Sequence, residues 1–277
     1  MRIYPLSEID NPPQTRIIRA EGRPIDTVAP RGFEYWQRLA DIIDQGPVED
    51  RDRFFHAMLK PLGIAKGAPF TPDGRQTQIL TEAAEVGFLM AQTISVAPRF
   101  DNAAGYPGAH GERVLALNPD QETEHYSQLD ERTDYTFEAI TVAAGMFKPI
   151  VGAGSQYMSA AKDATGAWLD GGNTYQLHVP ADVPVVENWS VTVDDNITRS
   201  VLKTSSNRPA LSSTDELQIN DDGSIDIFFG PTPPEGRETN WLQTEPDRGW
   251  FTYYFRWYGP TQEFFDQTWR LSDLTAI

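Results

Sequence analysis

The chain has 277 residues, enough for one large domain or two modest ones with a buried core. Its formal net charge of -17 argues against nucleic acid or an anionic membrane surface as a partner, because binding to either depends on lysine and arginine. Cysteine is absent, which excludes disulfides and thiolate metal sites and leaves the redox compartment open.

The first part of the chain is extended and then helical. Residues 1–30 are proline-rich, and one strand is expected at Ile17-Ile18. Apolar residues then recur every three or four positions, which is the spacing of helices that bury one face. Helices are expected between residues 33 and 46, 47 and 60, 73 and 93, and 133 and 147. Asp73 is expected to cap the third helix, and Tyr135 and Ala139 to face inward on the fourth.

From residue 152 the pattern changes to short strands, with turn residues between them about every ten positions. This spacing is typical of a β-sandwich or barrel. The expected strands are Tyr157-Met158, Thr174–Val179, Trp189–Val193, Leu217–Ile219, Ile225–Phe229 and Trp250–Tyr258. The predicted class is therefore α+β and mainly β. We expect a small helical domain over residues 31–100 and a β-sandwich domain with a helical insertion over residues 101–277.

Several short phrases, in a fixed order, add a family resemblance. The phrases are Lys162–Gly166, Leu169–Pro180, Asn188–Val193, Phe229–Pro231 and Arg256–Pro260, with Tyr4–Leu6 and Leu62–Phe70 upstream. Together they closely resemble bacterial proteins that pair a domain of unknown function 1254, here only its C-terminal end, with a domain of unknown function 1214. The resemblance implies a jelly-roll sandwich after a small helical domain, with residues 1–30 as the remnant of an upstream β-domain. It implies no established reaction.

Location is expected from two features of the sequence. No run of eighteen apolar residues is present, so no membrane-spanning helix is expected. The first residues lack the apolar core of a signal peptide, so the chain as written is expected in the cytoplasm. The family resemblance adds that relatives are often exported to the periplasm.

Arg256 is the strongest candidate for a site residue. Strand alternation places Trp250, Thr252, Tyr254, Arg256 and Tyr258 on one face of the last long strand, and Phe251, Tyr253, Phe255 and Trp257 on the core face. A face that mixes aromatic rings with a cation suits a cleft that stacks a ring and pairs a carboxylate or hydroxyl. The alternative role for Arg256 is a structural ion pair with a neighbouring strand, for example with Asp226.

Other ligand-binding candidates lie near the strand ends. Trp241 suits a platform that stacks on a sugar or another ring, with Asn240 beside it and Arg237 at the rim. Equally, Asn240 can bond the backbone of a turn while Trp241 plugs the end of the sandwich. Trp250 is a second stacking candidate. Arg199 follows an acidic pair and is expected either to contact the ligand or to form a structural ion pair.

His178 carries the catalytic hypothesis. It falls on the polar side of its strand, where a histidine suits a general base. Arg256 and Tyr258 would be the electrophilic and proton-donating partners, and all three side chains must then meet in one pocket. The four histidines lack the spacing of metal ligands, so neither a metal site nor a cofactor is expected.

Three functions therefore stay open. The first is the binding of a small polar or ring-bearing ligand, such as a carbohydrate, in a cleft of the jelly roll. The second is a metal-independent hydrolase or lyase, and the third is a structural or assembly role with a homo-oligomer formed through a free strand edge. The lack of a recognisable catalytic constellation slightly favours binding.

Overall fold

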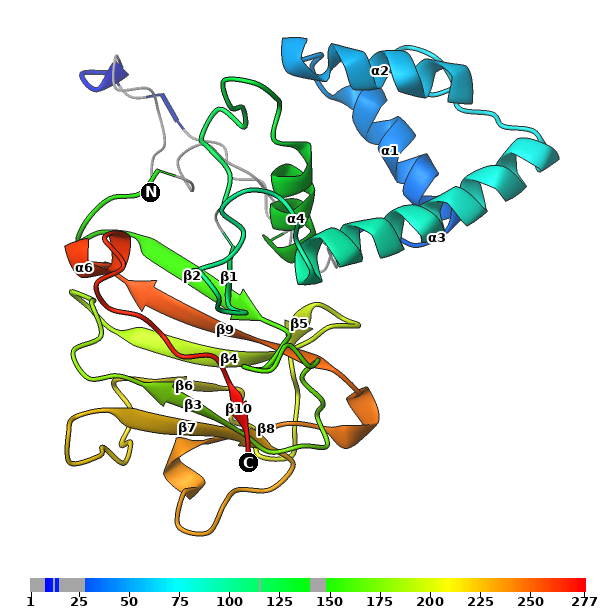
Figure 1. Cartoon of the computed structure of the whole chain (residues 1–277). Coiled ribbons are helices and arrows are strands. Elements are labelled where there is room, and N and C mark those ends of the chain that lie inside the picture. Colours follow the sequence, from blue (N-terminus) through cyan, green and yellow to red (C-terminus); the bar gives the residue numbers. More distant parts are fainter. Residues whose placement is uncertain (1–7, 12, 15–27, 115, 140–147) are drawn as a thin grey trace.

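The computed structural model describes residues 8–11, 13–14, 28–114, 116–139 and 148–277. The chain is α+β, with most of its helices in the first half and two mostly antiparallel sheets in the second (Figure 1). The strand expected at Ile17-Ile18 lies outside the described residues, as does the end of the helix expected up to residue 147.

Helices lie at all four predicted places. They are α1 (Phe33–Gln45), α2 (Arg53–Leu59), α3 (Gly74–Val96) and α4 (Leu129–Ala139). The predicted cap of α3 is confirmed, because the Asp73 carboxylate accepts the backbone N–H of Gln76 at 2.7 Å. A single 3-10 turn at Asp50–Asp52 precedes α2, and α4 begins four residues before the predicted Thr133.

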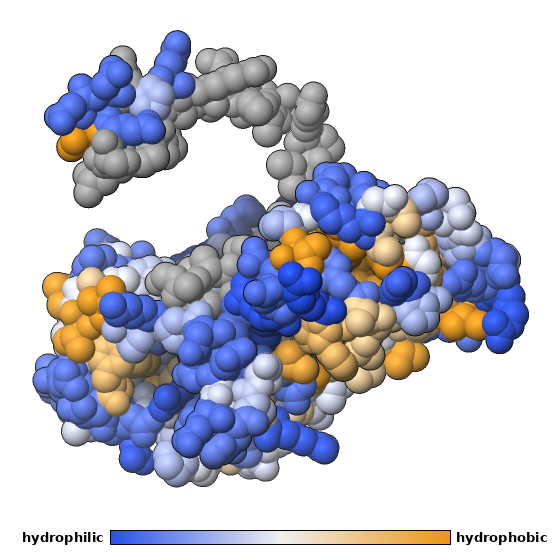
Figure 2. All heavy atoms as spheres, turned by 90° about the horizontal axis from the view of Figure 1, so that it is seen from above, coloured by the Kyte–Doolittle hydropathy of each residue, from blue (hydrophilic) through white to orange (hydrophobic). Residues whose placement is uncertain are grey.

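α3 is the one helix in the described part of the chain that is long and apolar enough to span a bilayer. This is weak evidence for a span, because core helices of soluble proteins have the same length and composition. α3 packs against α1 and α4. Val86, Leu89 and Met90 are exposed on it, and hydrophobic atoms gather over this helical part of the surface (Figure 2).

The strands form two sheets. The six-stranded sheet has the order β1-β2-β9-β4-β5, with β6 also paired to β4, and the four-stranded sheet has the order β10-β3-β7-β8. The bounds in the first sheet are β1 Glu112–Arg113, β2 Ser155–Ala160, β9 Phe251–Tyr258, β4 Trp189–Asp195, β5 Ser200–Val201 and β6 Ala210–Ser212. In the second they are β10 Thr275–Ala276, β3 Tyr175–Val179, β7 Ile225–Gly230 and β8 Trp241–Gln243. Only the β7–β8 pair is parallel among the paired strands described.

The core lies between the two sheets. The predicted alternation of β9 is confirmed: its inner residues Phe251, Tyr253, Phe255 and Trp257 are buried in one cluster with residues of β3 and β7. Phe229 of β7 stacks on Phe251 with the ring centroids 6.2 Å apart, so the sheets pack face to face. The other residues of β9 therefore point away from this core.

A second, smaller apolar cluster covers part of that outer face. It contains Tyr135 of α4 together with Val114 and Leu117, and Tyr157 of β2 and Tyr254 of β9 pack against it. This cluster fixes α4 to the outside of the six-stranded sheet, and Figure 1 shows α4 on the side of this sheet away from β3 and β7.

Among the described residues, the structure contradicts the strand predicted at Leu217–Ile219. Leu217 packs against the core, but Gln218 is held by the side chain of Asn240 rather than by the backbone of a neighbouring strand. The segment therefore keeps its apolar contact without entering a sheet.

Candidate functional site

A cavity of about 270 Å³ lies between the outer face of the six-stranded sheet and the helices α3 and α4. β1, β2, β4 and β9 form its sheet side, and the end of α3 and the second half of α4 form its helical side. Its lining includes the polar or aromatic side chains of Glu112, Glu138, Tyr157, Ser159, Asp194, Arg199, Trp250, Tyr254 and Arg256. Helices that cover only part of a strand face leave such a space.

Arg256 is held in place inside this cavity. Its Nη1 donates a hydrogen bond to Thr192 Oγ1 at 2.6 Å, and the Thr192 hydroxyl donates to Asp194 Oδ2 at 2.9 Å. The guanidinium carbon lies 5.3 Å from the ring centroid of Tyr254 and 5.9 Å from that of Tyr157. The alternative ion pair with Asp226 is wrong, because Asp226 lies on the other sheet and binds His178.

Carboxyl groups from three elements meet around the same cavity. Glu112 comes from β1, Asp194 from β4 and Glu138 from α4, with Asp134 one helical turn before Glu138. Glu138 Oε1 accepts hydrogen bonds from Ser159 at 3.3 Å and Ser95 at 3.5 Å. Glu138 Oε2 and Asp134 Oδ1 are buried and have no hydrogen-bond partner among the described residues.

This environment raises the pKa of every one of these carboxyls. Burial raises the pKa of Glu112 to about 8, and the charge of Glu138 adds to the rise while Lys162 opposes it. Burial likewise raises the pKa values of Asp134 and Glu138. At neutral pH the cluster therefore retains protons and can donate as well as accept hydrogen bonds.

Asp194 and Tyr254 complete the electrostatic picture. Burial raises the pKa of Asp194, although the hydrogen bond from Thr192 and the charge of Arg256 oppose the rise. Burial, followed by the charges of Glu138 and Asp194, raises the pKa of Tyr254 well above its usual value. Tyr254 is consequently a neutral phenol at any ordinary pH.

Two further predicted residues line the cavity. Trp250 lies just before β9, with its ring centroid 5.7 Å from that of Trp168. Arg199 Nη1 donates to the Phe137 carbonyl at 2.7 Å, and its guanidinium lies 4.3 Å from the Phe137 ring centroid. Tyr258 shares the outer face of β9 but is not part of the lining.

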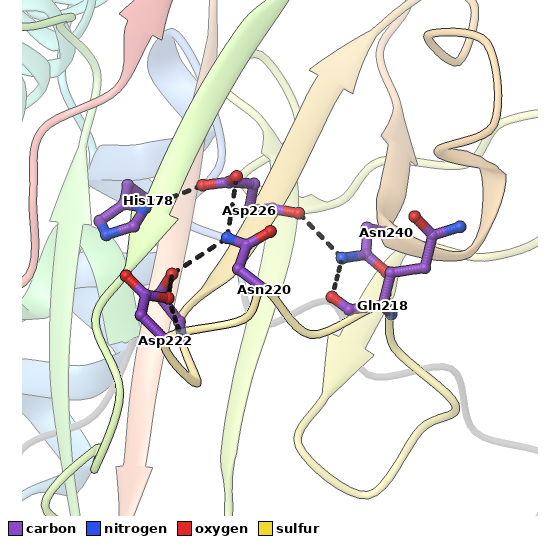
Figure 3. Close-up of polar contacts among 7 residues, drawn as sticks. His178, Gln218, Asn220, Asp222, Asp226 and Asn240 are labelled. Carbon is purple, nitrogen blue, oxygen red and sulfur yellow. Dashed lines mark hydrogen bonds and ion pairs between the residues drawn. The ribbon is translucent and has the colours of Figure 1, made fainter.

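His178 lies elsewhere. It is exposed on β3 of the four-stranded sheet, and its Nδ1 is 2.8 Å from Asp226 Oδ1 on β7 (Figure 3). The side chains of His178 and Arg256 point outward from opposite sides of the sandwich, whose sheets pack about 10 Å apart. The structure therefore does not bring His178, Arg256 and Tyr258 into one pocket. Alternation predicts which face of a strand is polar, but not to which sheet the strand belongs.

The remaining predicted residues also belong to the four-stranded side. Asn240 is 0% exposed, and its Nδ2 donates to the carbonyls of Gln218 and Asp226, both at 2.9 Å, while its Oδ1 accepts the Gln218 N–H at 2.8 Å (Figure 3). Trp241 Nε1 donates to the Gly230 carbonyl at 2.9 Å, and Arg237 donates to Gln218 Oε1 at 3.2 Å. These polar groups bond the protein itself.

The acidic residues of the cavity were not predicted as site residues. The sequence does hold one signal for them: Asp134 and Glu138 are spaced four apart on a predicted helix, beside the inward-facing Tyr135 and Ala139. Glu112 gives no such signal, because β1 has two residues. Among the described residues, no group of three or more His, Cys, Asp or Glu could hold a metal ion.

Comparison with known proteins gives one family match. The model of a family described as "Protein of unknown function (DUF1214)" matches residues 154–262, which run from the start of β2 through β9. The match supports the second half of the resemblance seen in the sequence, and the upstream 1254 part is not shown. No curated protein sequence matches the chain.

Two solved structures are similar at low identity. The VPA0106 protein from Vibrio parahaemolyticus is 16% identical, with a TM-score of 0.45, over 96% of this chain and 58% of that one. An uncharacterised protein from Burkholderia cenocepacia is 17% identical, with a TM-score of 0.31, over 86% of this chain and 52% of that one. This chain thus spans little more than half the length of either.

Proposed function

We propose that this protein binds a small polar, ring-bearing ligand, for example a carbohydrate, in the cavity between the helices and the six-stranded sheet. The observation that carries the proposal is that Trp250, Tyr254 and Arg256 line one cavity together with three carboxyls. Binding sites for small molecules combine apolar and aromatic walls with a few convergent polar groups in this way.

The wall of the cavity is well suited to bind without rearranging. Arg256 is already fixed by Thr192 and by two aromatic rings, so ordering it costs little when a ligand arrives. Trp250 and Tyr254 offer ring surfaces for stacking, and the serine hydroxyls and protonated carboxyls offer hydrogen bonds. Of the predicted site residues, Arg256, Trp250 and Arg199 take the ligand-contacting roles.

The proposal extends to the architecture. The β-rich part is a jelly roll, and residues 31–100 form a separate small helical domain. Two sheets with a shared core support the jelly-roll assignment. The parallel β7–β8 pair is a local departure from an all-antiparallel jelly roll.

A matched pair of tryptophan variants tests the binding proposal. Monosaccharides and small aromatic compounds are first screened by thermal shift, and each hit is titrated while tryptophan fluorescence is recorded. Trp250→Phe, in the cavity, should weaken binding about tenfold, because phenylalanine offers a smaller stacking surface than the indole ring. Trp241→Phe, on the other sheet, should leave the dissociation constant within about twofold.

The proposal fails if Trp241→Phe weakens binding as much as Trp250→Phe. It also fails if the wild-type protein gives no saturable response to any compound in the screen. Circular dichroism of both variants serves as the control for folding, since Trp241 loses its hydrogen bond to the Gly230 carbonyl in the phenylalanine variant.

One observation favours a second candidate, a metal-independent hydrolase or lyase. A carboxyl that keeps its proton at neutral pH is what a general acid requires, and Glu112 has a pKa of about 8. Glu112 would then take the proton-transfer role that the sequence suggested for His178. Turnover of a bound compound that is lost in Glu112→Gln while binding persists would support this candidate.

A further inference from the structure

Among the described residues around the cavity, carboxyl groups outnumber guanidinium groups. Arg199 and Arg256 supply its two guanidinium groups, and Asp195 in the lining is already paired with Arg248 at 3.2 Å. Against the two guanidiniums stand four carboxyls in or beside the cavity, those of Glu112, Asp134, Glu138 and Asp194. Arg256 forms no ion pair with any of these four among the described residues. The cluster thus has surplus carboxyls.

Two of the carboxyls have an unused oxygen. Asp134 is 4% exposed, and its Oδ1 has no hydrogen-bond partner among the described residues; the same holds for Oε2 of Glu138. The two residues are four apart on α4, so their carboxyls lie on one face of the helix. A buried acceptor without a donor costs about 1–3 kcal/mol. Glu138 lines the cavity, so its unused oxygen points to a donor that enters the cavity.

Building on the proposed function, we infer that the ligand carries a cationic nitrogen group with several N–H donors, which binds the carboxyls of Glu138 and Glu112. An amidinium, a guanidinium or a protonated amine has this chemistry. The ring of the ligand then lies toward Trp250 and Tyr254, on the β9 side of the cavity.

A cation fits this site better than a neutral or anionic group. A single hydroxyl donates one hydrogen bond, whereas an amidinium donates to two or more acceptors at once. The raised pKa of Glu112 reflects burial beside Glu138 with too little opposing charge, so a cation would favour the ionised carboxyls by direct attraction. A carboxylate ligand would instead meet like charges in a poorly solvated space.

Three probes of nearly equal shape test the inference. Benzamidine, benzamide and benzoate share one ring and differ in charge from positive through neutral to negative. The dissociation constants are measured by isothermal titration calorimetry at neutral pH and fixed salt. Benzamidine should bind at least about tenfold more tightly than benzamide, as expected for charge-assisted hydrogen bonds, and benzoate should bind more weakly than benzamide. In Glu138→Gln, which keeps the side-chain shape, the ratio of benzamide to benzamidine dissociation constants should fall toward one.

Glu216→Gln is the matched control. Glu216 is exposed in the loop between β6 and β7, so this variant makes the same change of net charge away from the cavity. The ratio should persist in it. If Glu138→Gln does not fold, Glu112→Gln on the sheet side of the cavity replaces it, with the same expected fall in the ratio.

Equal affinities for the three probes, or tightest binding of benzoate, overturn the inference and leave the proposed function standing. A ratio that falls equally in Glu216→Gln overturns it as well, because net charge alone then explains the preference. If none of the probes binds while the broader screen finds a neutral ligand that depends on Trp250, the inference fails by itself. A screen that finds no ligand at all overturns both the inference and the proposed function.

Discussion

The guanidinium of Arg256 lies over the ring of Tyr254, 5.3 Å from its centroid, although both residues belong to one strand. They are two positions apart on β9 and therefore share its outer face. The contact joins a permanent cation to a phenol that stays neutral, in front of a group of carboxyls. The polar wall of the cavity is thus built into the strand itself.

Removing Arg256 should raise the pKa of Asp194 further above its usual range. Burial raises this pKa now, and the Thr192 hydrogen bond and the charge of Arg256 oppose the rise. Arg256→Ala removes the charge and also the hydrogen bond that fixes Thr192. Carbon-13 NMR of the aspartate carboxyls, recorded as a function of pH, measures the change. Arg256→Lys keeps a positive charge and should show a smaller rise, and equal titration of Asp194 in all three proteins would contradict the argument.

Glu112 should make the protein less stable as the pH rises. Its folded pKa of about 8 lies above the ordinary value of 4.5, so the folded chain holds a proton that the unfolded chain releases in this window. Its contribution is complete below the unfolded pKa and is lost as the pH rises through the folded pKa, at a slope of at most about 1.4 kcal/mol per pH unit. Glu112→Gln removes this contribution to the slope.

Urea unfolding of wild type and Glu112→Gln at several values between about pH 5 and pH 8 measures the difference. The free energy of unfolding of the variant should fall less over this range. Some decline should persist, because Asp134, Glu138 and Asp194 also have raised pKa values. Parallel curves for the two proteins would mean that Glu112 is ionised in the folded state.

Asn240→Ala should destabilise the fold and leave the cavity intact. The side chain makes three buried hydrogen bonds to backbone groups of Gln218 and Asp226, and each lost bond leaves a polar group unpaired at a cost of about 1 kcal/mol or more. We expect the free energy of unfolding in urea to fall by about 3 kcal/mol.

Glu235→Ala is the control for this prediction, since Glu235 is exposed in the neighbouring loop and its loss should cost less than about 0.5 kcal/mol. Probe affinity at the cavity should be unchanged in folded Asn240→Ala, because Asn240 belongs to the opposite sheet. Weakened binding there, with unchanged stability, would return Asn240 to the ligand-contacting role suggested by the sequence.

Local patterns in the sequence predicted the parts of the fold that repeat over several residues. The 3.6-residue spacing located α1 and α3, and alternation assigned every residue of β9 to its correct face. Strands of two or three residues, such as β1 and β8, carry too few positions for any period to be recognised. The segment at Leu217–Ile219 has a strand-like apolar pattern but forms no strand, because the side chain of Asn240 binds its backbone.

Only part of the candidate site could be predicted from the sequence. Arg256 and Trp250 stand out because strand alternation places them on the same face. Glu112 and Glu138 join them through the packing of α4 on the sheet, a contact between segments distant in sequence. His178 was a reasonable choice by residue type, but its sheet could not be inferred from its own neighbours.

β9 uses both of its faces, one for the hydrophobic core and the other for the cavity. A shift of its register by a single residue would exchange the two sets of side chains and lose both at once. The strand therefore leaves little freedom to alter ligand preference without endangering folding. Residues of α3 and α4 face the same space under fewer constraints, so a changed specificity, whether evolved or engineered, is expected to begin on the helical side.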